Sequence, residues 1–219
     1  MASAKINNRG QGSKVDHNSN AQPLSPKQKH EVSIDQHVRP GIIIHPLGPV
    51  KGRILQHLAM SLQQCCQMPC SVGKLLENPA YARDPVRVQN CCRRILQRLQ
   101  RYGSSECWRI LAVTESDLFM PALKYVFGAA QMEGKCAVIS LHRLRPEYYE
   151  EVEDESLLLE RLVKTALHEL GHSLGLIHCR RRTCVMYSST RIRDTDAKMA
   201  EFCPTCRELF KWRLKNEIS

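Results

Sequence analysis

The segment HELGHSLGLIHC, residues 168–179, restricts the possible structures of this chain more than any other stretch. It closes a run from residue 154 to residue 175 that begins with acidic residues and stops at a glycine, a pattern that predicts one helix. His168 and His172 are four residues apart, so on that helix they lie on one face and can bind one metal ion. The neighbouring leucines face elsewhere and can anchor the helix to a sheet. The helix is therefore predicted to contribute both to the core and to a metal site.

A third histidine can join the first two only if the helix ends. In a continuous helix His178 would lie about 240° from His172 around the axis and would face away from the site. Gly175 allows a left-handed conformation and a sharp turn, which could return His178 to the metal. Three neutral imidazoles with an open fourth position are typical of a catalytic zinc. Glu169, about 100° round the helix from His168, is near enough to act on a water molecule at the metal without being a ligand.

Four cysteines follow the histidines in two pairs, which suit a second zinc ion held by four thiolates in a closed, structural site. The sequence thus predicts two zinc ions per chain, one catalytic and one structural. Two alternatives stay open: four free thiols in a loop, or a zinc module that binds nucleic acid, although the segment between the pairs has no obvious recognition helix. The predicted ligands of the structural zinc are Cys179, Cys184, Cys203 and Cys206.

The chain has eleven cysteines among 219 residues, and its first residues lack the apolar core of a secretory signal. Its apolar runs are broken by charges before they reach the roughly 20 residues that a membrane-spanning helix needs. We therefore predict an intracellular protein, cytoplasmic or nuclear, without a transmembrane segment. In such a compartment thiols are kept reduced, so the cysteines are expected to be free thiols or metal ligands.

The formal net charge of +10 suggests an acidic partner such as nucleic acid. The arginines, however, cluster at residues 93–101 and 180–182 without the aromatic residues that would stack on bases. The sequence therefore favours a solvated basic face over nucleic-acid binding. No pattern predicts a particular oligomeric state.

Residues 1–40 are rich in Asn, Ser, Gln and Lys and almost lack large apolar side chains, which predicts a disordered tail. A folded domain is predicted over residues 41–215, where strand-like segments alternate with segments of helical periodicity. This alternation predicts an α/β fold, a compact single domain with a mixed, mostly parallel sheet flanked by helices, ending in the cysteine segment. The predicted strands are 41–44, 70–76, 110–113 and 137–141, and the predicted helices are 50–66, 87–102 and 154–175.

The histidine segment, followed by RRRTC, Met186 and CPTC, resembles the signature of the archaemetzincins, a branch of the metzincin zinc metallopeptidases. The likeness extends upstream through residues 115–145 to IIIHPLG at residues 42–48, so it covers about residues 42 to 210. It implies a zincin-like active-site helix, with Met186 in a methionine turn beneath the metal. It also implies that the strand at residues 137–141 can pair with an extended peptide.

The resemblance implies that His168, His172 and His178 bind the catalytic zinc, that Glu169 is the general base, and that peptides or proteins are the substrates. Zinc would acidify water and polarise the scissile carbonyl, and Glu169 would move the protons. A zinc-stabilised protein that binds peptides without cleaving them is the alternative. Glu169 favours an enzyme, because a binding module has no need of a base.

Overall fold

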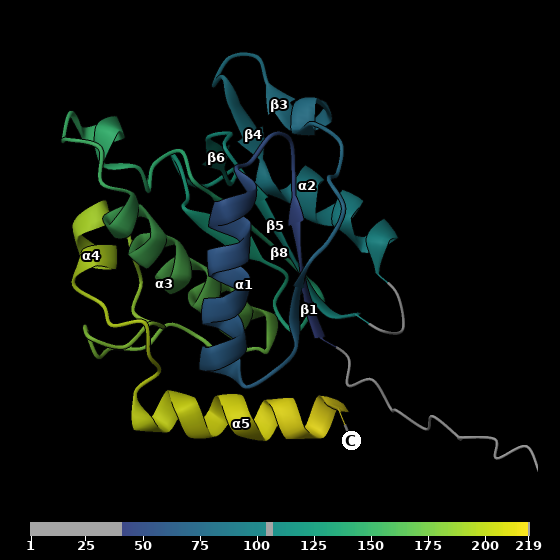
Figure 1. Ribbon diagram of the computed structural model, residues 1–219, viewed down its shortest axis with the longest axis vertical. Helices are drawn as coiled ribbons and strands as arrows, with labels where there is room; N and C mark the ends of the chain where they lie inside the picture. The colour runs from purple at the N-terminus through teal and green to yellow at the C-terminus, as the bar shows by residue number, and fades with distance from the viewer. Residues whose placement is uncertain (1–40, 104–106, 219) are drawn as a thin grey trace, which may run out of the picture. The chain divides into compact units, whose positions relative to one another are not determined.

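The computed structural model describes residues 41–103 and 107–218, and the predicted tail at residues 1–40 lies outside them. The described part is built around a five-stranded sheet in the order β2-β1-β5-β8-β7. Figure 1 labels three of these strands, β1, β5 and β8. The first four strands in this order run parallel, and β7 runs antiparallel to β8. The predicted α/β fold with a mixed, mostly parallel sheet is therefore confirmed. The strands are β1 (Gly41–Pro46), β2 (Cys70–Val72), β5 (Cys107–Thr114), β7 (Gly128–Ala130) and β8 (Cys136–Ser140).

Helices cover both faces of this sheet. α1 and α3 contribute to one hydrophobic core and α2 contributes to another, on opposite faces (Figure 1). Two more helices, α4 and α5, follow in the C-terminal segment, and three short 3-10 helices span Pro79–Ala82, Gln100–Tyr102 and Pro146–Tyr149. The α-helices are α1 (Gly52–Cys66), α2 (Cys92–Leu99), α3 (Glu155–Ser173), α4 (Ile192–Asp196) and α5 (Pro204–Ile218).

The central strands supply side chains to both cores. In β5, Leu111 and Val113 belong to the core beneath α1 and α3, whereas Ile110 and Ala112 belong to the core beneath α2. Successive side chains of a strand point to opposite faces, so a strand between two helical layers must be apolar at every position. This is why residues 110–113 of β5 appear in the sequence as an unbroken apolar run, whereas the buried Arg109 near the start of the strand pairs with Glu217.

The helix predicted over residues 87–102, with Val88 on its apolar face, begins later in the structure. Gln89–Cys91 form strand β4, which lies in a small three-stranded sheet between β3 (Arg83–Asp84) and β6 (Leu118–Phe119). Val88 is exposed and has a φ of 58°, a left-handed conformation that no helix accommodates. The prediction was wrong for residues 87–91 because β4 pairs with β3 and β6. The helical periodicity of a sequence gives no sign of such pairing.

The strand predicted to pair with a peptide is an interior strand. β8 is hydrogen-bonded to β5 on one side and to β7 on the other. Its backbone groups are already used, so the expectation of peptide pairing at residues 137–141 is corrected. Within the described residues, the sheet ends at β7, and this edge is the one beside α3.

Helix α3 carries several ionisable side chains into the core. Asp154 caps its start by accepting a hydrogen bond from the Leu157 backbone at 2.9 Å. Farther along, Arg161, Lys164, His168 and Glu169 are all buried. Buried ionisable groups are rarely retained without a partner or a function, and the last two belong to the segment predicted to bind metal.

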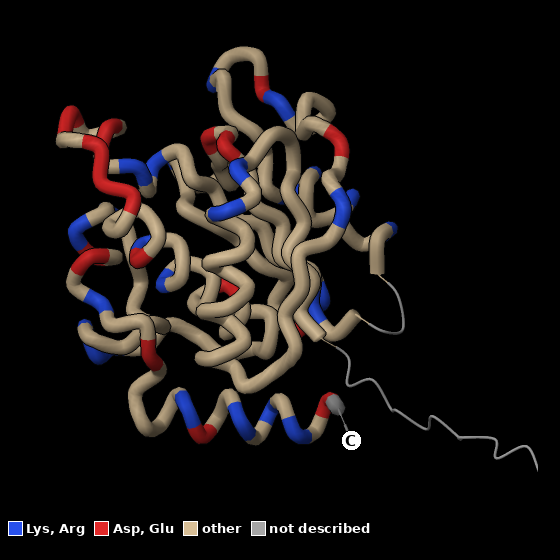
Figure 2. Tube along the Cα trace, in the orientation of Figure 1, with Lys and Arg blue, Asp and Glu red and all other residues tan. Residues whose placement is uncertain are grey.

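The positive charges are spread over several elements. α5 carries both basic and acidic residues, and Lys and Arg also occur on many other segments (Figure 2). Several of them form ion pairs, such as Arg207 with Glu201 and Arg213 with Glu133. None of the helices in the described ranges combines the length and apolar composition that crossing a membrane requires.

Candidate functional site

The last two turns of α3 and the turn after it bring three histidines together. Gly175 has a φ of 79°, and its N–H donates to the His172 carbonyl at 2.8 Å, which ends the helix and reverses the chain. The Nε2 atom of His172 consequently lies 3.1 Å from that of His168 and 3.2 Å from that of His178. Nitrogen ligands of a tetrahedral zinc, each about 2.0–2.1 Å from the metal, lie roughly 3.3 Å apart. The donor set therefore fits a zinc ion.

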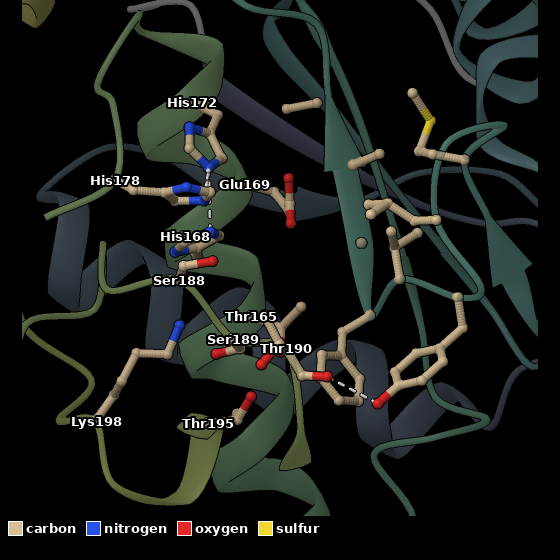
Figure 3. Close-up of a pocket in the computed structure, with 18 of the residues that line it drawn as sticks. Thr165, His168, Glu169, His172, His178, Ser188, Ser189, Thr190, Thr195 and Lys198 are labelled. Carbon is tan, nitrogen blue, oxygen red and sulfur yellow. Dashed lines mark hydrogen bonds between the residues drawn. The ribbon is translucent and has the colours of Figure 1, made fainter. Parts of the chain in front are cut away.

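Two of these histidines are oriented by backbone carbonyls. Nδ1 of His168 lies 2.8 Å from the Val185 carbonyl oxygen, and Nδ1 of His172 lies 2.7 Å from that of Leu176. A carbonyl can only accept, so each Nδ1 donates its proton and each Nε2 keeps a free lone pair directed at the common centre. Figure 3 shows the three rings converging in this way.

The surroundings keep these histidines neutral. Burial lowers the pKa of His168 well below its usual value, and the positive charge of Lys198 lowers it further. Burial likewise lowers the pKa of His172 and His178. Neutral imidazole is the form that binds a metal, so the folded protein holds its candidate ligands in the required protonation state.

Glu169 faces the cavity between α3 and the edge strand β7 (Figure 3). Burial raises its pKa to about 8, and the nearby charge of Lys198 offsets only part of this effect. Its side chain passes so close to Gly128 that a Cβ there would lie 2.8 Å from the Glu169 Cγ atom. Gly128 therefore leaves the space that Glu169 occupies.

Met186 packs against α3 at Gly171, the residue before His172. It is fully buried, and a Cβ on Gly171 of α3 would collide with its sulfur atom. The preceding residue, Val185, supplies the carbonyl that orients His168. Sequence periodicity alone could not have singled out this methionine, because buried methionines are common packing residues; only the family resemblance pointed to it.

The four cysteines of the C-terminal segment form a second cluster. Their four sulfur atoms lie within 4.8 Å of one another, and those of Cys179 and Cys203 are 3.9 Å apart. Sulfur ligands about 2.3 Å from a tetrahedral zinc would be roughly 3.8 Å apart, so this cluster also fits the metal. The backbone N–H of Cys206, at the start of α5, lowers the pKa of Cys203 to about 7, which favours the thiolate. The cluster comprises Cys179, Cys184, Cys203 and Cys206.

The two clusters share one stretch of backbone. Cys179 directly follows His178, and its N–H donates to the Met186 carbonyl at 2.9 Å. The loop between them is thereby closed, and it carries Cys184 back to the cysteine cluster. Fixing the cysteines therefore also fixes the position of His178.

A cavity of about 610 Å³ adjoins the histidines and Glu169. Residues 125–130, which include β7, line one wall, and residues 188–190 together with Thr195 and Lys198 line one end. Lys198 was not identified from the sequence, because a lysine in a polar stretch gives no signal of burial. In the structure only 4% of its surface is exposed.

Comparison with known proteins places this architecture in a family. The profile of Peptidase family M54 matches residues 79–212. The archaemetzincin of Methanocaldococcus jannaschii is 39% identical over 165 residues, which are 75% of this chain and 89% of the relative. The archaemetzincin of Pyrococcus furiosus is 36% identical over 184 residues, 81% of this chain and 95% of the relative.

Solved structures agree. The crystal structure of the archaemetzincin from Methanopyrus kandleri has a TM-score of 0.72 and 32% identity, covering 83% of this chain and 99% of that one. The crystal structure of a zinc-dependent peptidase from Methanocorpusculum labreanum has a TM-score of 0.71 and 30% identity, covering 78% of this chain and 100% of that one. Fold and matches together define a zinc metallopeptidase. Within that class, the chain belongs to the archaemetzincin family, peptidase family M54, and the resemblance noted in the sequence is confirmed.

Proposed function

We propose that this chain hydrolyses peptide bonds at a zinc ion held by His168, His172 and His178, with Glu169 as the general base. The observation that carries the proposal is the convergence of three histidine Nε2 atoms, 3.1 and 3.2 Å apart, beside a buried carboxylic acid in a cavity. A closed structural site would need neither the cavity nor the acid.

A zinc ion at these nitrogens would polarise the scissile carbonyl and acidify the attacking water. Its positive charge would also lower the pKa of Glu169, which burial alone raises to about 8. Glu169 would then accept a proton from the attacking water and donate it to the leaving amine. The Val185 and Leu176 carbonyls would hold two of the imidazoles in place during this exchange.

The edge strand β7 is the proposed support for the substrate. Its outer backbone groups border the cavity opposite α3, and an extended peptide can add to such an edge by main-chain hydrogen bonds. Gly128 within β7 lies against Glu169, so a peptide paired there would pass the proposed base. Residues 188–190 and Lys198 would contact its side chains.

We further propose that Cys179, Cys184, Cys203 and Cys206 hold a second, structural zinc, which gives two zinc ions per chain. All eleven cysteines are described, and none of them forms a disulfide. An intracellular location, cytoplasmic or nuclear, stays a prediction from the sequence.

The test is to replace Glu169 by Gln, which keeps the size of the side chain and removes the base. Wild type and variant, both loaded with zinc, are incubated with a diverse peptide mixture, and the products are identified by mass spectrometry. Cleavage should fall by at least about 100-fold in the variant, the usual contribution of a general base. Native mass spectrometry should find two zinc ions in both proteins, because Glu169 is not a proposed ligand.

His168→Ala serves as the control for metal loss and should retain only one zinc ion. Full activity in Glu169→Gln would refute the role of the base. A wild-type protein that holds two zinc ions and binds peptides but cleaves none would instead support the alternative of a peptide-binding protein without turnover.

A further inference from the structure

The cavity beside the histidines has two chemically different parts. The part along β7 is mainly apolar, whereas the far end is lined by hydroxyl groups and one ammonium group (Figure 3). The polar end comprises Thr165, Ser188, Ser189, Thr190, Thr195 and Lys198. None of these residues takes part in the proposed proton transfers, so they are available for recognition of the substrate.

Lys198 is the buried cation whose charge is not matched by an ion pair. Four Lys and Arg side chains are buried in the described part of the chain, and three of them contact a carboxylate: Arg109 with Glu217, Arg161 with Asp196, and Lys164 with Glu160. The fourth, Lys198, forms no ion pair with a described carboxylate.

The Lys198 ammonium group is instead held by neutral acceptors. It donates to the carbonyl oxygens of Tyr187 at 2.8 Å and Val185 at 3.2 Å. An ammonium group has three N–H donors, so this pair of carbonyls leaves one donor available toward the cavity. Burying a charge without an ion pair is unfavourable, and burial lowers the pKa of Lys198 to about 8, although the charges of Glu169 and Asp194 act in the opposite direction. An anion entering the cavity would compensate this charge.

Ser189 provides a second unused polar group at the same end. Its hydroxyl oxygen is shielded from solvent and has no hydrogen-bond partner among the described residues. Buried hydroxyl groups are normally hydrogen-bonded, so this one is a candidate to donate to a ligand. The segment that carries it is fixed, because the Tyr125 hydroxyl donates to the neighbouring Thr190 carbonyl at 2.8 Å (Figure 3).

The hydrogen bond between Tyr125 and Thr190 indicates where the polar end of the cavity would lie along a substrate paired with β7. Tyr125 precedes β7, so the polar end is beside the entry to the strand, while the loop after β7 contacts the His172 carbonyl through the Glu133 N–H. A peptide running antiparallel to β7 would pass Ala130 first and Tyr125 last. Antiparallel pairing is slightly more stable than parallel pairing. Residues that follow the scissile bond would therefore reach Lys198.

We propose that Lys198 and Ser189 form a subsite for a carboxylate on the substrate, on the C-terminal side of the scissile bond. This inference rests on the proposed peptidase function for the position of the bond, but binding of the carboxylate does not require turnover. The carboxylate can come from an Asp or Glu side chain next to the scissile bond or from the C-terminus of the peptide. The first source would make the protein selective for acidic sequences, and the second would make it selective for peptide ends.

The test uses three short peptides that carry an N-terminal hydroxamate to anchor them on the zinc. They differ only at the residue after the hydroxamate and at the C-terminus: Glu with an amidated end, Gln with an amidated end, and Gln with a free carboxylate. Dissociation constants are measured by calorimetry on the full, zinc-loaded chain. This readout does not depend on cleavage.

At least one carboxylate-bearing compound should bind about 10- to 100-fold more tightly than the amidated Gln compound, the usual range for a hydrogen bond to a charged group. A gain with the Glu side chain identifies the first source, and a gain with the free C-terminus identifies the second. Equal binding of all three compounds, or binding of none, would overturn the proposal.

Lys198→Met should remove this difference. Lys164→Met is the matched control, because Lys164 is also buried but pairs with Glu160 outside the cavity, and it should leave the difference intact. If Lys198→Met fails to fold, Ser189→Ala should reduce the difference, with Ser61→Ala in α1, away from the cavity lining, as the control. Discrimination that persists in Ser189→Ala and Lys198→Met would also overturn the proposal.

The outcomes separate this inference from the proposed activity. Discrimination among the hydroxamates without any cleavage of the peptide mixture would refute the peptidase function and keep the carboxylate subsite. Cleavage that depends on Glu169, with no preference for a carboxylate at Lys198, would keep the function and refute the subsite.

Discussion

At the scale of single residues, the contact between Gly171 and Met186 determines how closely α3 approaches the turn that orients His168. Gly171 lies in α3 next to His172, and Met186 is fully buried beneath it. Glycine within a helix usually destabilises it by roughly 0.5–1 kcal/mol relative to alanine. Here the absent side chain makes room for the methionine, so packing outweighs helix propensity.

Gly171→Ala should therefore destabilise the protein in spite of the better helix propensity of alanine. Its Cβ would collide with the Met186 sulfur, and overpacking of a core typically costs about 1–3 kcal/mol. Urea unfolding should show this decrease in the free energy of unfolding, and peptide cleavage should fall with it. Gly52→Ala is the control: Gly52 begins α1 with no atom near its Cβ position, so stability should be unchanged or slightly higher. Equal stability of the two variants would contradict the packing role of Gly171.

At the scale of elements, Asp117 joins the small sheet to the turn that follows β8. It precedes β6, and it accepts hydrogen bonds from Arg143 in that turn at 2.7 Å and from Gln89 in β4 at 2.8 Å. Burial raises the pKa of Asp117, but the hydrogen bonds from Arg143 and Gln89 outweigh it, and the pKa is lowered. The carboxylate form is thus favoured by folding.

The stabilisation from Asp117 should be pH-dependent. Because its folded pKa lies below the ordinary value of 3.8, the contribution is complete above that value and is lost as the pH falls through the folded pKa. Asp117→Asn should lower the free energy of unfolding by about 1–3 kcal/mol at pH 7, and the difference from wild type should narrow below pH of about 4. Urea unfolding across this range measures it, with Glu208→Gln on the exposed face of α5 as a control without effect. A difference that does not change with pH would refute the role of the charge.

At the scale of the whole molecule, the proposed structural zinc supports the proposed catalytic one. The cysteine cluster joins residues 179–184 to residues 203–206 at the start of α5, and Cys179 adjoins His178. The main core between the sheet, α1 and α3 is formed largely by aliphatic side chains and includes only two of the four cysteines, Cys184 and Cys203. We therefore expect the central sheet to stay packed without the metals and the C-terminal segment to lose its packing.

Removal of both zinc ions by a chelator should lower the Tm by at least about 10 °C, because structural zinc sites contribute several kcal/mol and each kcal/mol shifts a domain of this size by a few degrees. Far-UV circular dichroism should keep most of its signal, since the sheet and α1 to α3 remain packed. Cys184→Ser should retain one zinc ion and show most of this decrease in Tm. His168→Ala should also retain one zinc ion but show a smaller decrease in Tm. A larger decrease in His168→Ala than in Cys184→Ser would contradict the assignment of the cysteine site as structural and the histidine site as catalytic.

Local patterns predicted much of the fold and of the candidate site. The helix ending at Gly175 and the buried strands around Ile110 and Val138 were predictable because their periodicity and end signals lie within a short stretch. The start of the helix predicted at residues 87–102 was wrong, because residues 89–91 pair with β3 and β6. These tertiary contacts outweigh the local helical pattern. The expectation that residues 137–141 form an edge strand was wrong for the same kind of reason, since an edge strand is defined by which strands lie beside it.

The sequence by itself determined that three histidines come together as candidate metal ligands, because the spacing of His168 and His172 on a helix and the turn at Gly175 are local geometry. It also determined the α/β class, because unbroken apolar runs alternate with amphipathic ones. Only the tertiary structure decided that β7 is the edge of the sheet, that Gly171 makes room for Met186, and that Lys198 is buried at the end of the cavity. These properties depend on contacts between residues far apart in the chain, and the sequence near each residue carries no trace of such contacts.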